Sequence, residues 1–250
     1  MTQPLVLHGM NSPNVVKVIL MLEECGLDYE LRHVAVFAQA QFDPDFLAMN
    51  PVGKVPVLED PQLGTPLAES GAILHWLAER EGKFLPASQP ARAEVMQWLM
   101  VQMANYGPML GQLNHFTLVL RPGTEPYAEG RYRAVAEKLY RVLDERLAQQ
   151  YDMGREWLAG GAYSIADMAM QPWANYLEWH GFDAAAHPAL VAWRTRIAAR
   201  PAHQRAQARV ASDLNPEAER TRKSASKHDL DRFFGRTGTV PDADFSMVKE

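Results

Sequence analysis

Residues 54–74, KVPVLEDPQLGTPLAESGAIL, contain two short extended runs followed directly by the start of a helix. One run is Val55–Leu58 and the other is Pro66–Ala68. Short apolar segments bounded by polar or turn-forming residues are typical of strands. A helix is expected next, over Glu69–Glu81. This stretch therefore predicts a β-β-α unit.

A β-α-β unit is predicted upstream of this stretch. Leu5–His8 is a short apolar run, and residues 14–26 form a helical pattern that is apolar on most sides, as in a buried helix. Tyr29–Val36 is rich in strand-forming residues. The order β-α-β, a loose connection and then β-β-α predicts a small α/β domain with a mixed sheet over residues 1–82.

The rest of the chain predicts helices. Residues 83–90 separate helical patterns with two prolines and are interpreted as a linker. No convincing strand follows, so an all-helical domain is expected over residues 91–212. We expect the polar tail, residues 213–250, to be irregular and to dock through its few apolar residues. Helical periodicity is found over 91–120, 125–150, 164–180 and 187–199, and the apolar tail residues are Leu230, Phe233, Phe234 and Phe245.

Composition and charge exclude several classes of function. The chain has 25 Lys and Arg against 30 Asp and Glu, a net charge of −5, which argues against a nucleic-acid partner. Cys25 is the one cysteine of the sequence, so no intrachain disulfide or Cys-based metal cluster can form, and the eight His lack metal-site spacing. We expect no metal, and we expect Cys25 to be a small buried residue. The N-terminus does not resemble a signal peptide, and Lys17 and Glu23 interrupt the nearby apolar run, so we expect no membrane segment and a cytoplasmic protein.

The start of the first helix is a candidate anion site. Ser12 and Pro13 are favoured residues at a helix start, and Asn14 follows them. Free backbone N–H groups and positive potential at such a start stabilise a thiolate or another anion. The alternative is that Ser12 only caps its own helix.

The bond between Val55 and Pro56 is a candidate peptide-binding element. X-Pro bonds are where cis peptides occur at appreciable frequency, and a cis bond would turn the Val55 N–H and C=O outward, ready to pair with an extended peptide. A trans proline on an edge strand is the alternative.

Two further pairs of residues could bind charged groups. Glu69 and Ser70 lie where an extended segment becomes a helix, and together they could hold the amine and carboxylate of an amino acid. The alternative is a helix cap. Gln41 and Lys54 flank these segments and could bind another carboxylate.

Other motifs are interpreted as structural. Ser164 and Asp167 form an S-x-x-D capping box. Residues 107–112, GPMLGQ, interrupt a long helix and either shape a cleft or bend it around the core. Glu23 and Glu24 are interpreted as a solvated helix edge.

The order and spacing of these features resemble those of the cytosolic glutathione transferases, over residues 4 to about 210. The resemblance is greatest to the bacterial nu class, and it implies a thioredoxin-like N-terminal domain, an all-helical C-terminal domain and a homodimer. It rests on residues 12–14, residues 69–74, residues 107–112 with Asn114, His115 and Phe116, and residues 163–167 with Pro172 and Trp173.

The resemblance also implies roles for residues around the thiol of glutathione. Ser12 occupies the place of the nu-class threonine near the glutathione sulfur, and Asn14 matches the class asparagine. Serine keeps the hydroxyl and loses a methyl group. Val55, before a cis Pro56, would pair with the cysteinyl backbone of glutathione.

Roles at the two ends of glutathione are implied in the same way. Glu69 and Ser70 would hold the γ-glutamyl end, and Gln41 and Lys54 would face the glycyl end. Arg131 matches a family arginine that reaches across from the neighbouring subunit.

The expected function is that of a glutathione-dependent disulfide-bond oxidoreductase, with reduced or disulfide-form glutathione as co-substrate and organic peroxide reduction as a side activity. The resemblance implies this function, and a chain with one cysteine is compatible with it because both reacting sulfurs then belong to ligands. Its partners would be glutathione and a small disulfide, peroxide or electrophile. The alternatives are a conventional transferase that conjugates glutathione to electrophiles and a non-catalytic glutathione-binding regulatory protein.

Overall fold

The computed structural model describes residues 4–119 and 123–235, which divide into two compact units. One unit combines the residues up to Glu81 with those from Arg200 onward, and the other consists of residues 82–199. The first unit is therefore built from two separate parts of the sequence. Each unit is described below by itself.

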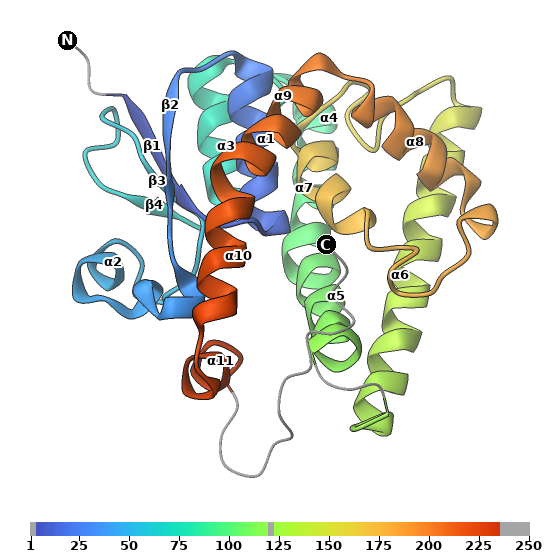
Figure 1. Ribbon diagram of the computed structural model, residues 1–250. Coiled ribbons are helices and arrows are strands. Elements are labelled where there is room, and N and C mark those ends of the chain that lie inside the picture. Colours follow the sequence, from blue (N-terminus) through green and yellow to red (C-terminus); the bar gives the residue numbers. More distant parts are fainter. Residues whose placement is uncertain (1–3, 120–122, 236–250) are drawn as a thin grey trace. The chain divides into compact units, whose positions relative to one another are not determined.

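The first unit contains a four-stranded mixed sheet with the strand order β2-β1-β3-β4 (Figure 1). β1 runs parallel to β2 and antiparallel to β3, and β4 is antiparallel to β3. This arrangement confirms the expected mixed sheet. The strands are β1 (Leu5–Gly9), β2 (Tyr29–His33), β3 (Val57–Glu59) and β4 (Leu67–Ala68).

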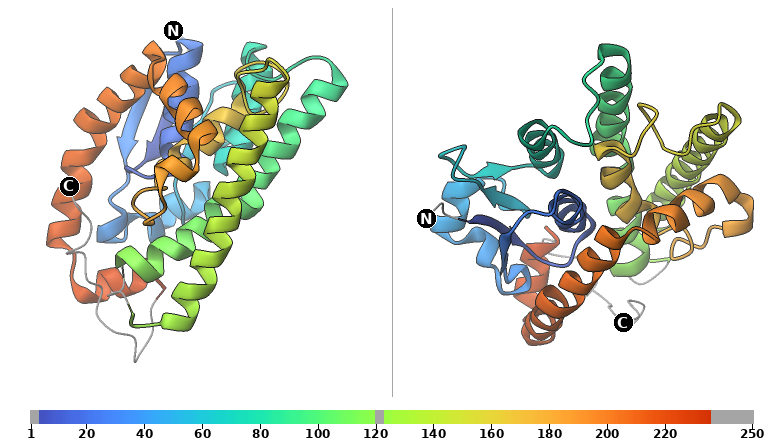
Figure 2. Two further views of the ribbon diagram at one scale, coloured as in Figure 1. Left: turned by 90° about the vertical axis from the view of Figure 1, so that its right-hand side faces the viewer. Right: turned by 90° about the horizontal axis from the view of Figure 1, so that it is seen from above.

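Helices cover both faces of this sheet. α1 and α3 lie on one face and the short α2 lies on the other (Figure 2). α1 is buried on most sides, as its pattern predicts, and it ends at Gly26, whose left-handed backbone (φ 69°) closes the helix. The segments are α1 (Pro13–Cys25), η1 (Val36–Ala38), η2 (Ala40–Phe42), α2 (Pro44–Met49) and α3 (Ser70–Glu81).

The first part of the polar tail is helical, so the expectation of an irregular tail is wrong for residues 215–233. Its charges pair within the helices: Arg220 with Glu217 and Lys223 with Glu219, at spacings that place them on one helix face. Ser226 and Asp229 form a capping box. Phe245 lies outside the described residues. The C-terminal segments of this unit are α9 (Pro201–Arg209), η6 (Val210–Leu214), α10 (Asn215–Ser224) and α11 (Lys227–Phe233).

Ion pairs hold the C-terminal part of the first unit to α1. Arg200 meets Glu24 at 2.5 and 2.8 Å, and Arg205 meets Glu23 at 2.9 Å. The Glu24 side chain is only 6% exposed. The interpretation of these two glutamates as a solvated helix edge is therefore wrong, because α9 covers them.

The second unit contains no strand within its described residues, 82–119 and 123–199, which confirms the all-helical expectation. Residues 89–119 form a nearly continuous helix in which two π-helical turns flank residues 107–114. Its segments are α4 (Gln89–Val101), η3 (Gln102–Tyr106), α5 (Gly107–Asn114), η4 (His115–Val119), α6 (Pro126–Asp152), α7 (Ile165–Ala174), η5 (Ala184–Ala186) and α8 (Pro188–Ala198).

The two glycines of α5 explain how this interrupted helix packs. A Cβ at Gly107 would lie 3.5 Å from the Trp173 ring and only 2.8 Å from Gln102, and one at Gly111 would lie 3.4 Å from the same ring. The distances to the ring are ordinary contacts, so α5 packs directly on the tryptophan of α7, and the one crowded contact is that of Gly107 with the Gln102 side chain. The motif serves packing within this unit.

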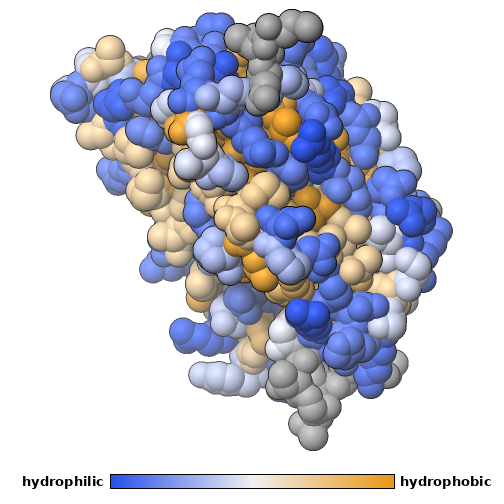
Figure 3. All heavy atoms as spheres, turned by 90° about the vertical axis from the view of Figure 1, so that its left-hand side faces the viewer, coloured by the Kyte–Doolittle hydropathy of each residue, from blue (hydrophilic) through white to orange (hydrophobic). Residues whose placement is uncertain are grey.

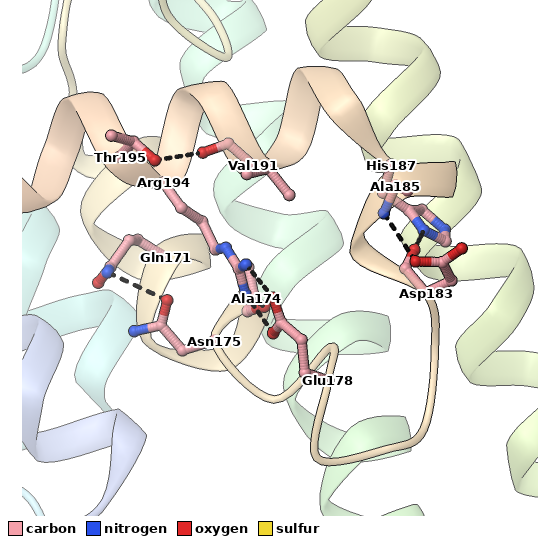
Figure 4. A network of polar contacts seen from close by, with 10 residues as sticks. All are labelled: Gln171, Ala174, Asn175, Glu178, Asp183, Ala185, His187, Val191, Arg194 and Thr195. Carbon is pink, nitrogen blue, oxygen red and sulfur yellow. Dashed lines mark hydrogen bonds and ion pairs between the residues drawn. The ribbon is translucent and has the colours of Figure 1, made fainter.

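Polar contacts fix the ends of α7 to the rest of the second unit. The capping box is confirmed, and the buried Asp167 also accepts hydrogen bonds from the Leu158 N–H and the Trp193 indole, at 2.9 and 2.8 Å. At the other end, Arg194 of α8 donates to the Ala174 carbonyl at 3.1 Å and pairs with Glu178 (Figure 4). α8 is thus tied to both ends of α7.

One buried charge in the first unit was not anticipated from the sequence. Lys17 of α1 is fully buried, and desolvation lowers its pKa from 10.5 to about 7, although the negative charge of Glu69 opposes this shift. The folded state therefore binds fewer protons than the unfolded chain between about pH 7 and 10. Stability must rise with pH over that interval.

Replacement of the lysine tests this burial. In Lys17→Met, we expect the rise in unfolding free energy above pH 7, roughly 1.4 kcal/mol per pH unit from this one group, to be lost. Urea unfolding of both proteins between pH 7 and 9 measures the difference. Parallel pH profiles for the two proteins would contradict the lowered pKa.

Disruption of the contact between α9 and α1 should also be measurable. Glu24→Gln removes the carboxylate that pairs with the partly buried Arg200, so we expect a loss of about 2 kcal/mol of unfolding free energy. Glu217→Gln breaks an ion pair with Arg220 that is exposed to solvent and should leave stability unchanged. Equal stability of the two variants in urea would show that α9 is not anchored here.

Candidate functional site

Strand register brings four segments of the first unit to one end of the sheet. Gly9, at the end of β1, pairs with His33, at the end of β2. His8 pairs with Val57, the first residue of β3, and Val57 pairs with Ala68, the last residue of β4. The segments that follow β1, β2 and β4 and the segment that precedes β3 therefore all leave from this end.

These four segments carry eight of the nine candidate site residues. The end of the sheet thus gathers residues that are up to 58 positions apart, from residue 12 to residue 70. The segment after β1 carries Ser12 and Asn14, the segment after β2 carries Gln41, the segment before β3 carries Lys54, Val55 and Pro56, and the segment after β4 carries Glu69 and Ser70.

Ser12 is the N-cap residue of α1, but its hydroxyl makes no capping hydrogen bond. Its carbonyl accepts the first helical bonds, from Val15 and Val16 at 3.0 and 2.9 Å, and Pro13 occupies the first turn. A simple cap would use the hydroxyl on the helix itself. The hydroxyl therefore lies at the positive end of α1 and is not used for capping.

A glycine brings this helix start close to the sheet. A Cβ at Gly9 would lie 2.5 Å from a methyl carbon of Val15. Only a residue without a side chain permits this approach of β1 to the first turn of α1. Asn14, in the same turn, is half-buried.

The bond between Val55 and Pro56 is cis. The turn before it is held by Asn50, a buried residue that the sequence analysis did not single out. Its side-chain amide donates to the Lys54 carbonyl at 2.6 Å, and its side-chain oxygen accepts from the Val52 N–H at 3.1 Å. Asn50 thus fixes the approach of the chain to the cis bond.

Gly53 packs this turn against the segment that carries Gln41. Its backbone is left-handed (φ 65°), and a Cβ there would lie 3.2 Å from the Gln41 carbonyl oxygen and 3.1 Å from the Phe42 ring. The exposed Lys54 follows directly. Gln41 and Lys54, which are expected to bind the same carboxylate, therefore lie on segments that contact each other.

Gln41 contains an unsatisfied buried acceptor. The side chain is 2% exposed, and its Oε1 atom accepts no hydrogen bond within residues 4–119 and 123–235. An orphaned buried acceptor costs on the order of 1–3 kcal/mol. A ligand that donates a hydrogen bond there would recover this cost.

Glu69 adopts a backbone conformation that is uncommon for a residue with a side chain. Its φ of 70° lies in the left-handed region, and such outliers gather at binding sites because the surrounding structure must enforce them. Glu69 is exposed, whereas Ser70, the first residue of α3, is buried. The buried Lys17 of α1 lies close enough to Glu69 for the charges of the two side chains to interact.

Arg131 is the ninth candidate, and it belongs to the other unit. It is an exposed residue of α6, in the second unit. Together with Tyr127, which is 82% exposed, and Lys138 it lines an open surface cavity of about 540 Å³.

The remaining expectations concern Cys25, metals and membranes. Cys25 is half-buried at the end of α1, so it is less buried than expected. Within the described residues, no cluster of three or more His, Cys, Asp or Glu could hold a metal ion. None of the described helices is long and apolar enough to cross a membrane.

Two family models match the chain. The model described as "Glutathione S-transferase, N-terminal domain" matches residues 11–80, and the model described as "Glutathione S-transferase, C-terminal domain" matches residues 107–201. The first match contains all eight candidate residues of the first unit, and the second contains Arg131.

Curated relatives and solved structures agree with these matches. The disulfide-bond oxidoreductase YfcG of Escherichia coli is 43% identical over 78% of this chain and 91% of its own length. The disulfide-bond oxidoreductase YghU of the same organism is 34% identical over 81% of this chain and 73% of its own.

Two bacterial structures illustrate the similarity in three dimensions. A glutathione transferase family member from Pseudomonas fluorescens, solved with two glutathione bound, has a TM-score of 0.72 and 38% identity, over 81% of this chain and 92% of that one. A glutathione transferase from Pseudomonas putida, with one glutathione disulfide bound per subunit, has a TM-score of 0.73 and 36% identity, over 81% and 90%. On this evidence the chain belongs to the glutathione S-transferase family.

Proposed function

We propose that this protein is a glutathione-dependent disulfide-bond oxidoreductase that uses bound glutathione, or its disulfide, as co-substrate. One observation carries the proposal: four segments of the first unit meet at one end of the sheet, beside a helix start whose serine hydroxyl is not used for capping. Relatives named as disulfide-bond oxidoreductases and neighbours solved with glutathione support it.

The four segments match the chemical groups of the tripeptide. Val55, before the cis bond, presents backbone N–H and C=O groups to the cysteinyl residue, and Pro56 sets their direction. Glu69 and Ser70 hold the γ-glutamyl amine and carboxylate. The glycyl carboxylate and its amide lie towards Lys54 and Gln41, with the buried Gln41 oxygen accepting an N–H.

The start of α1 holds the glutathione sulfur as a thiolate. The Ser12 hydroxyl and the Asn14 amide donate to the sulfur, and the positive end of the helix favours its negative charge. The thiolate is the reactive form of a thiol, so donors that lower its pKa increase the reactive fraction at neutral pH.

The reaction then proceeds by two exchanges. The thiolate attacks one sulfur of the substrate disulfide, forming a mixed disulfide and releasing one substrate thiolate, which takes up a proton. A second glutathione thiolate attacks the glutathione sulfur of the mixed disulfide and releases the other substrate thiol. Two glutathione molecules are oxidised to one glutathione disulfide, the substrate is reduced to two thiols, and no sulfur of the protein takes part.

We also propose a homodimer in which Arg131 of each subunit completes the site of the other. The exposed Tyr127 and the open cavity beside Arg131 on α6 support an interface on this surface. A reducing compartment, the cytoplasm, suits a chain with one cysteine and glutathione as its co-substrate.

A pair of substitutions tests the source of the reacting sulfur. We expect Ser12→Ala to raise the pKa of bound glutathione and to lower kcat/KM for reduction of a small dialkyl disulfide about tenfold, the equivalent of one pKa unit. Cys25→Ala should leave the activity unchanged, because this thiol lies at the far end of α1. Thiolate absorbance of the glutathione complex against pH, with steady-state reduction rates, measures both effects.

Several outcomes would contradict the proposal. Loss of activity in Cys25→Ala would mean that a protein thiol carries the reaction. Conjugation of glutathione to an electrophile that is much faster than disulfide reduction would favour a conventional transferase. Glutathione binding with neither activity would favour a regulatory protein.

A further inference from the structure

Helix α11 packs on the segment that carries Gln41. The Phe233 ring lies 5.0 Å from the Phe37 ring between centroids, and Leu230 packs on the same buried group. We call this group the loop cluster; it consists of Val34, Val36, Phe37, Phe46 and Val57. The C-terminal helix therefore closes the apolar core beneath residues 34–42.

Two polar contacts from α11 bracket Gln41. The Gln39 side-chain amide donates to the Asp229 carbonyl at 2.6 Å, and the Arg232 guanidinium lies 4.6 Å above the Phe42 ring. These contacts fall two residues before Gln41 and one residue after it. Both sides of the glutamine are thus held by the same helix.

The segment needs such support because its backbone is unfavourable. Gln39 has a φ of 71°, in the left-handed region that residues with a side chain rarely adopt. A conformation of this kind persists only where surrounding contacts enforce it. Within the described part of the chain, α11 supplies three of those contacts, through Phe233, Asp229 and Arg232.

The C-terminal helices also reach the other parts of the candidate site. Val55 packs against the loop cluster, as Leu230 and Phe233 do. At the other end of this helix pair, Asn11, the residue before Ser12, donates to the side-chain oxygen of Asn215 at 2.5 Å. α10 therefore contacts the residue before Ser12, and α11 supports Val55 and the segment that carries Gln41.

The match to the family's C-terminal domain ends at residue 201, before either helix. Apolar side chains reach the surface between hydrophilic ones on the face of the molecule drawn in Figure 3. Leu230 and Phe233, which pack on the loop cluster, therefore follow the part of the chain that the family models match.

We infer that α11 is a positioning element for glutathione: by holding residues 36–42, Phe233 and Arg232 set the affinity of Gln41 and Val55 for the tripeptide. This inference rests on the proposed function, since Gln41 and Val55 act only if glutathione binds at this end of the sheet. Phe233 and Arg232 touch no reacting atom and act through the loop.

A matched pair of phenylalanine substitutions in the full chain tests this role. We expect Phe233→Ala to raise the Kd and KM for glutathione about fivefold or more, in the range of typical couplings between sites, with kcat nearly unchanged. Phe234→Ala is the control: it removes the adjacent ring, which contacts Phe233 but is not among the described side chains packed on the loop cluster. Phe233→Leu should restore most of the affinity. A purely structural role would lower the melting temperature without this separation of KM from kcat.

A second pair keeps the test valid if Phe233→Ala fails to fold. Arg232→Ala removes an exposed arginine from the Phe42 ring, and Arg220→Ala removes another exposed arginine from α10. We expect weaker glutathione binding by calorimetry, and faster hydrogen exchange of the amides of residues 36–42, for the first variant alone.

Glutathione binding by the wild-type protein separates failure of the proposed function from failure of the role of α11. If wild-type protein does not bind glutathione, the proposed function is overturned. If it binds and the folded Phe233→Ala and Arg232→Ala variants bind equally well, the function stands and the role of α11 is overturned.

Discussion

The candidate site depends on the pairing of β1 with one parallel and one antiparallel neighbour. Because β3 runs against β1, the residue that opens β3 lies beside the residues that close β1, and β4 returns to the same place. Pro56, Glu69 and Ser12 are therefore brought together by backbone hydrogen bonds. A shift of β3 by one residue would reverse which side chains face the core and would separate Val55 from the other segments.

The first unit contains paired charges that join its two parts and one buried charge that costs stability. Glu24 pairs with Arg200, directly before α9, and Glu23 pairs with Arg205 of α9, so the two ion pairs join distant parts of the sequence. Lys17 is buried in α1, where its charge is costly to hold, yet it lies in the field of Glu69, whose backbone is left-handed. A buried charge close to a residue with a left-handed backbone costs stability, and costs of this kind are found at functional sites.

Most of the fold could be predicted from local signals. Periodicity and turn residues indicate the strands after residues 4, 28 and 54, the capping box of Ser164 and the helices of the second unit. The helices after residue 213 could not be predicted from apolar periodicity, because their signal is charge spacing and a second capping box, at Ser226. The candidate residues were found through local motifs and family resemblance. The support given by Asn50 and Gln39 could not be predicted, because it consists of a few hydrogen bonds between a side chain and the backbone, one of them to a residue 190 positions away.

The division of the first unit between both ends of the sequence has a consequence for biosynthesis. Residues 4–81 are synthesised long before α9–α11. Until those helices are made, the loop cluster lacks the side chains of α11, and Glu23 and Glu24 lack their arginine partners. The intervening helical unit is continuous in sequence and can fold during that interval. Completion of the sheet end that carries the candidate residues is then among the last events of synthesis, so that truncated chains would be released without it.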